Sequence, residues 1–264
     1  LGKTKGDKKN VFYSASHVEH VRSIFDTLWM SFLAALTAPF KDIDDDETTK
    51  TCLEGLKLSI NIAASFGLDY ARTSFIGALI QFANLSNLKE IKDKNVDAIV
   101  LLLKIAETNG NNLKNSWRDI LTTISQVERL QLISKGIEAD LLPDVTNARV
   151  HRTSLDSTRT TNSSNFFFGL GRKATPAEQA QTNHQNQHLD PAIAQRLVST
   201  DIVVVMDKVY TQSAQLNGSA IIDFIRALTE VAYEEIESSL DSHTPRTFSL
   251  QKVIDVCYYN MGRI

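Results

Sequence analysis

Apolar residues recur every three or four positions along most of this chain, the spacing that places them on one face of an α-helix. The first such stretch begins after Ser16, which together with Glu19 three residues later forms a capping-box signature. It is expected to stop at Pro39, because proline lacks the amide hydrogen that a helix interior needs. The same spacing predicts further helices at about 46–66, 69–85, 93–108, 116–134, 191–198, 200–214, 219–239 and 247–261.

Turn-forming residues are sparse, since 11 glycines and 5 prolines favour long helices over many turns. Gly67 stands where a C-cap glycine belongs, and Ser116 is expected to be the N-cap of its helix. No stretch alternates apolar and polar residues as a strand would, and the β-branched run at 202–205 is interpreted as part of a buried helix. The predicted fold class is therefore all-α.

Several of the expected helices are apolar around much of their circumference, so each needs helical neighbours on two sides. Stacked helices supply such neighbours, and we expect an armadillo/HEAT-like α-solenoid of about eight or nine helices. No strict sequence repeat is evident, so this architecture rests on helix spacing alone. The chain divides into a Lys-rich tail at 1–13, helical parts of one domain at 14–143 and 190–264, and a polar insertion at 144–189.

The insertion differs from the rest of the chain in composition. Between 151 and 190, nearly half of the residues are Ser, Thr, Asn or Gln, and aliphatic residues are few. Such a segment buries too little apolar surface to offset the entropy of ordering it, so we expect a long flexible connection. Asp190 and Pro191 indicate where helix resumes, because Asp caps helices and Pro is favoured in the first turn.

Composition narrows the function classes. The chain has 264 residues, with 28 Lys and Arg against 31 Asp and Glu, a net charge of −3. This balance argues against a nucleic-acid binder, which normally carries a marked basic excess. Two cysteines, Cys52 and Cys257, fit a reducing cytosolic compartment rather than a disulfide scaffold. No apolar run reaches the roughly 18 to 20 residues that span a bilayer, and no signal peptide is visible at the Lys-rich start.

Candidate catalytic and metal-binding patterns are weak. His17 and His20 are three residues apart, whereas the helical metalloprotease pattern needs four, so we interpret them as solvated helix-start residues. His184 and His188 are four apart but lie in the polar insertion. The acidic run at 42–47 lacks the ligand spacing of a calcium loop and reads as a helix-capping loop or, alternatively, a surface for a basic partner. We therefore predict no catalytic residue, metal or cofactor.

One cluster stands out within the insertion. Three aromatic residues and a leucine are followed by two cations, a composition typical of insertion at an anionic membrane interface. Alternatively, the cluster holds the insertion in a groove of its own domain, or docks like a peptide on a partner. The candidate contact residues are Phe166, Phe167, Phe168, Leu170, Arg172 and Lys173.

Short motifs resemble those of a known family, in the same order along the chain. They are SHVEHVR at 16–22, FLAA at 32–35, CLEG at 52–55, KNVD at 94–97, NGNNL at 109–113, NSW at 115–117, ISQVE at 124–128, IIDF at 221–224, PRTFSLQK at 245–252 and YYNMGRI at 258–264. Together they resemble the first homology-downstream-of-catalytic (HDS) domain of trans-Golgi large Arf guanine-nucleotide exchange factors, the BIG and Sec-seven type. The resemblance covers nearly all of the chain outside the insertion and the Lys-rich start.

This resemblance implies a regulatory role without catalysis, because nothing here resembles the motif that carries the glutamate finger of the exchange domain. The family implies binding of Arf in its GTP form at the membrane, which recruits the factor, relieves its autoinhibition and gives positive feedback. The implied location is the cytosol and the cytosolic face of the trans-Golgi network. The alternative is a structural scaffold that packs against other domains of the parent factor, or in its homodimer, without touching Arf.

Overall fold

The computed structural model describes residues 17–85, 90–137, 189–240 and 245–263, and within them the chain is helical with no β-strand. The α-helices are α1 (Val18–Asp42), α2 (Asp46–Ser65), α3 (Asp69–Ala83), α4 (Asp93–Asn109), α5 (Ser116–Ser134), α8 (Pro191–Leu197), α9 (Thr200–Thr211), α10 (Gly218–Ser238) and α11 (Phe248–Tyr259). Short 3-10 turns follow at Gly110–Asn112, Gln212–Gln215 and Met261–Arg263. The all-α prediction is confirmed.

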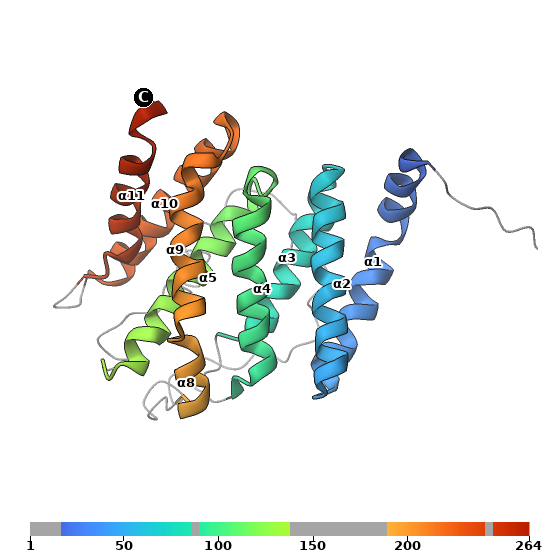
Figure 1. Cartoon of the computed structure of the whole chain (residues 1–264), viewed down its shortest axis with the longest axis horizontal. Helices are drawn as coiled ribbons and strands as arrows, with labels where there is room; N and C mark the ends of the chain where they lie inside the picture. The colour runs from blue at the N-terminus through green and yellow to red at the C-terminus, as the bar shows by residue number, and fades with distance from the viewer. Residues whose placement is uncertain (1–16, 86–89, 138–188, 241–244, 264) are drawn as a thin grey trace, which may run out of the picture.

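The helices form two layers that run from one end of the molecule to the other (Figure 1). One layer contains α1, α3, α5 and α10 in that order, and each packs against the next. The other contains α2, α4, the consecutive α8 and α9, and α11. Each helix of the first layer packs against a helix of the second, as in α1 with α2 and α10 with α11. This stacking of helix pairs is the predicted solenoid-like arrangement.

Connections alternate between two edges of this stack. Links within a pair lie at the lower edge in Figure 1, where α1 meets α2 and α5 is followed by α8. Links between pairs lie at the upper edge, where α2 turns into α3 at Gly67, which has a φ of +66° as a C-cap glycine requires. The predicted insertion therefore leaves and re-enters the fold within the third helix pair, at the lower edge.

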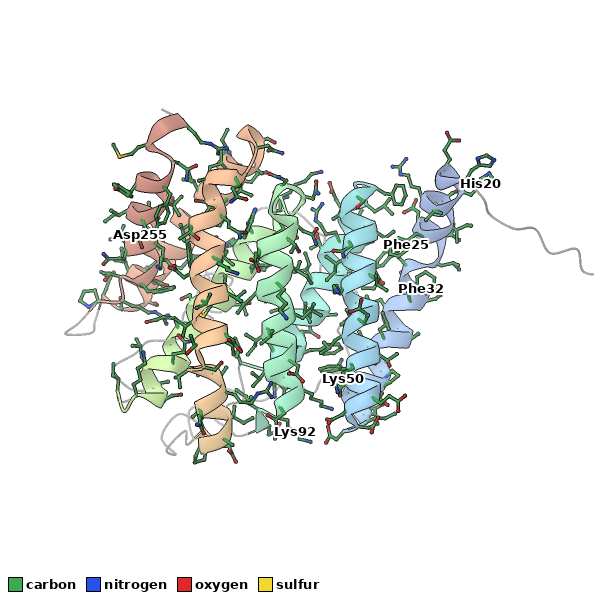
Figure 2. All side chains as sticks on the ribbon, viewed as in Figure 1. His20, Phe25, Phe32, Lys50, Lys92 and Asp255 are labelled. Carbon is green, nitrogen blue, oxygen red and sulfur yellow. The ribbon has the colours of Figure 1, made fainter. Side chains whose placement is uncertain are left out.

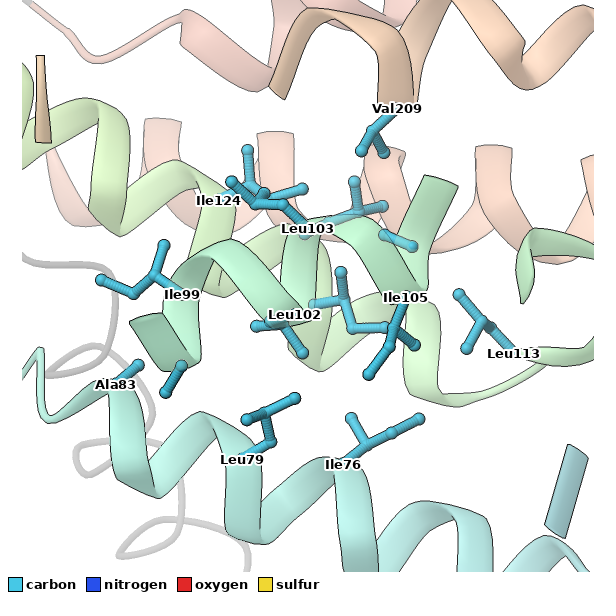
Figure 3. Close-up of a cluster of buried hydrophobic side chains, with 14 of the residues drawn as sticks. Ile76, Leu79, Ala83, Ile99, Leu102, Leu103, Ile105, Leu113, Ile124 and Val209 are labelled. Carbon is cyan, nitrogen blue, oxygen red and sulfur yellow. The ribbon is translucent and has the colours of Figure 1, made fainter. Parts of the chain in front are cut away.

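The hydrophobic core runs continuously through both layers. Figure 3 shows its centre, where side chains from α3, α4, α5 and α9 meet. Aromatic pairs extend it toward the ends of the stack. Phe40 of α1 stacks on Phe82 of α3 with 3.9 Å between ring centroids, and Trp117 of α5 meets Phe224 of α10 edge-to-face at 4.7 Å. The described helices therefore share one continuous hydrophobic core.

Three local predictions need correction. Pro39 does not end the first helix, because α1 continues to Asp42. Proline costs little here, since it lies in the last turn and the carbonyl of the exposed Ala35, four residues earlier, remains accessible to water. Ser116 is the first helical residue rather than the N-cap, a position held by Asn115. The run at 202–205 is helical as predicted, but Val203 and Val204 are exposed.

One helix among the described residues, Glu19–Asp42 within α1, is long and apolar enough by length and composition to cross a membrane. The sequence did not predict this helix as a candidate span, because Arg22 and Asp26 interrupt its run of apolar residues. Buried core helices pass the same test, and α1 buries Phe25 and Phe40 against its neighbours. Only 11% of the most apolar part of this helix is buried, however, so most of that part faces outward.

Candidate functional site

The residues predicted to contact a membrane or a partner, Phe166 to Lys173, lie outside the described residues. The structure does describe both ends of the segment that carries them. α5 ends at Ser134, and Asp190 is the N-cap of α8, with its carboxylate accepting a hydrogen bond from the Ala192 amide at 2.8 Å. Gln131 of α5 donates to the Leu197 carbonyl of α8 at 2.8 Å. The two ends are thus joined by direct contact at the lower edge of the solenoid.

The histidine pair shows no sign of metal binding. His17 is the N-cap of α1 without a capping hydrogen bond, and its ring lies edge-on to that of His20, with 5.7 Å between centroids. His20 lies at the outer end of α1 (Figure 2). In the described part of the chain, no group of three or more His, Cys, Asp and Glu side chains converges as a metal site would require.

The acidic loop between α1 and α2 has structural partners. Asp45 caps α2 by accepting a hydrogen bond from the Thr48 amide at 2.9 Å. Asp44 pairs with Lys92 and, at 2.5 Å, with Lys94, both at the start of α4. Hydrogen bonds from these two lysines lower the pKa of Asp44 from 3.8 to about 2. These contacts support the helix-capping interpretation of the loop.

The KNVD motif connects three neighbouring helices. Lys94 donates to the Phe40 carbonyl at the end of α1 at 2.7 Å, which satisfies an oxygen that the helix leaves unpaired. Asn95 donates to a carbonyl in the last turn of α3, also at 2.7 Å, while its own side-chain oxygen caps α4. Asp97 accepts from Arg196 of α8 at 2.7 Å. The motif therefore stabilises packing and does not present a free contact surface.

The NGNNL and NSW motifs act in the same way at the opposite edge. Trp117 is 1% exposed and its indole nitrogen donates to the Gly110 carbonyl at 3.2 Å. A Cβ at Gly110 would lie 2.6 Å from the end of the Leu216 side chain and 3.2 Å from the Trp117 ring, so a larger residue there would require these side chains to shift. Asn111 accepts a hydrogen bond from the backbone amide of Asn217 at 2.8 Å, which ties this turn to the start of α10.

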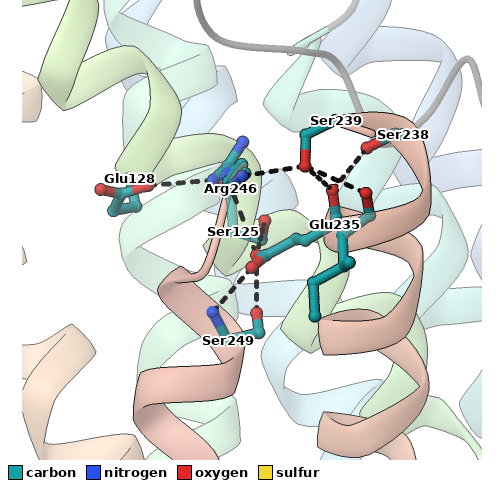
Figure 4. A network of polar contacts seen from close by, with 8 residues as sticks. Ser125, Glu128, Glu235, Ser238, Ser239, Arg246 and Ser249 are labelled. Atoms are coloured by element: carbon teal, nitrogen blue, oxygen red, sulfur yellow. Dashed lines mark hydrogen bonds and ion pairs between the residues drawn. The ribbon is translucent and has the colours of Figure 1, made fainter. Parts of the chain in front are cut away.

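A buried polar network joins two motifs that are more than a hundred residues apart (Figure 4). The carboxylate of Glu235 is fully buried and accepts hydrogen bonds from Ser125 Oγ at 2.6 Å and from the Ser249 amide and Oγ, both at 2.7 Å. Arg246 donates to Glu128 at 2.9 Å and to the Ser125 carbonyl. Burial raises the pKa of Glu128, against the opposing charge of Arg246. This network fastens α11 to α5 and α10.

The motifs on both sides of this network were recognisable in the sequence, but Glu235 at its centre was not. The helical spacing of the sequence does place Glu235 on the core side of α10, because it lies four residues after Val231 and seven after Leu228, which are both buried. A carboxylate on the core side of a helix predicts a buried partner. In the sequence, however, the acidic run around it looks like a solvated face.

A surface hollow of about 580 Å³ lies between α5 and α10. Arg118 crosses it and pairs with Glu234 and, at 3.3 Å, with Glu230. Arg226, Thr229 and the exposed Tyr233 complete the lining. The charges of Arg118 are thus already compensated within the hollow, and its lining offers no nucleophile paired with a general base. The hollow has no feature of a catalytic site.

Comparison with known proteins finds relatives that match the whole chain. No protein-family model matches the chain. The ADP-ribosylation factor guanine nucleotide-exchange factor SEC7 of Saccharomyces cerevisiae is 60% identical over 266 residues, covering 100% of this chain and 13% of that protein. In sequence, the chain is similar to one region of the Sec7 and BIG-type exchange factors. The exchange factor sec72 of Schizosaccharomyces pombe is 43% identical over 97% of the chain, and human Brefeldin A-inhibited guanine nucleotide-exchange protein 1 is 38% identical over 96%.

The chain spans about one seventh of the length of these relatives, between 13% and 14% of each. What is homologous is therefore one region of a large Arf exchange factor, which agrees with the predicted resemblance to an HDS domain. The structure adds that this region is an all-α stack. Its motifs at 94–97, 109–117, 124–128 and 245–249 supply contacts between helices.

Proposed function

We propose that this chain is a non-catalytic regulatory domain of a trans-Golgi Arf exchange factor, which binds Arf-GTP at the membrane, recruits the factor and relieves its autoinhibition. The observation that carries the proposal is the 60% identity, over the whole chain, to an exchange factor for ADP-ribosylation factor. A stacked helical fold suits the role, because solenoids bind compact partners along extended surfaces made by successive repeats.

The proposed membrane contact lies in the insertion, at Phe166, Phe167, Phe168, Leu170, Arg172 and Lys173. Its support is compositional, an apolar cluster next to two cations. The position of the insertion is compatible with this role, because its two ends meet at one edge of the stack and the rest of the fold does not depend on a short connection there. A GTPase anchored in the same bilayer would add a second contact, and two weak contacts together bind far more tightly than either alone.

The direct test is flotation of the chain with liposomes that carry lipid-anchored Arf, loaded with either a GTP analogue or GDP, next to bare liposomes. We expect recovery with the GTP form only, or much more strongly with it. Equal recovery on all three liposomes would place the affinity in the lipid and contradict selective Arf binding. Absence of recovery on any of them would favour the scaffold alternative.

Two features of the structure are compatible with the scaffold alternative. The motifs that define the resemblance are occupied in packing, and α1 presents an outer face that is apolar and uncharged. Both features suit a domain whose main contacts are with other parts of the parent factor. Binding of the isolated chain to the remainder of the factor, in the absence of Arf, would favour this scaffold.

A further inference from the structure

We draw no further inference here: the strongest candidate, the exposed apolar surface that Val21, Ile24 and Leu28 form on α1 at one end of the helical stack, carries none, because nothing in the described structure shows what covers it.

Discussion

At the residue scale, Glu235 links three helices through one buried carboxylate. Removing it leaves the Ser249 amide, the Ser125 hydroxyl and part of the Arg246 charge without their acceptor. Loss of one partner from a buried ionic network is strongly destabilising, so Glu235→Ala should lower the free energy of unfolding by about 3–5 kcal/mol. Urea denaturation measures this. The exposed Glu54→Ala is the control and should change little; equal effects would contradict the role assigned to the network.

Trp117 tests the hydrophobic core at the same scale. It is almost completely buried between the Gly110 turn and Phe224. Truncation to alanine removes the ring and leaves a cavity, so Trp117→Ala should cost about 3–5 kcal/mol. Tyr70 is 76% exposed, and Tyr70→Ala should be close to neutral. A near-neutral result for Trp117→Ala would mean that the indole is not part of the core.

At the element scale, the salt bridges of Asp44 join the α1–α2 loop to the start of α4. Because its folded-state pKa is depressed from 3.8 to about 2, Asp44 stabilises the fold above pH 4 and loses this effect as the pH falls toward 2. Asp44→Asn should therefore weaken the dependence of stability on pH between 4 and 2. Chemical denaturation at several pH values measures the slope. Asp26→Asn, at an exposed position of α1, should leave the slope as it is.

The helices themselves were predictable from the sequence, and the reasons are local. Apolar spacing located α5 at Ser116–Ser134, in agreement with the prediction, because one strongly periodic stretch lies between clear turn residues. The end of α1 was not predictable from Pro39, since proline is tolerated where the carbonyl that loses its partner can reach water. The end of α3 at Asn84, with a φ of +50°, also depends on a left-handed cap that its sequence signals only weakly.

At the scale of the whole molecule, the sequence predicted a solenoid but not its contacts. Helix spacing implies neighbours on two sides, whereas the meeting of Ser125 with Glu235 and Arg246 depends on how distant pairs stack. The same holds for α1, because exposed apolar residues such as Ile24 and Leu28 look in the sequence like part of a core-facing stretch. Only the arrangement of α1 at the end of the stack separates the side that is buried from the side that is exposed.

The proposed membrane contact makes a prediction at this scale. Replacing Phe166, Phe167 and Phe168 together with alanine should weaken liposome binding and leave the thermal melt nearly unchanged, because the expected contact is with lipid and not with the core. Flotation and a melting curve on the same preparation measure both effects. A large fall in melting temperature would instead show that the three rings pack within the domain.

Excision of the insertion tests whether the third helix pair depends on its connection. α5 and α8 contact each other directly, and Gln131 bridges them. Replacing 144–188, the insertion without the half-buried Leu189, with a short Gly/Ser linker should therefore preserve the helical circular dichroism spectrum. Shortening a flexible connection about fivefold lowers its closure entropy, so stability should rise by about 1 kcal/mol. Circular dichroism and urea denaturation measure the two effects. A cooperative loss of structure would show instead that residues of the insertion pack into the solenoid, which contradicts the prediction of a flexible segment.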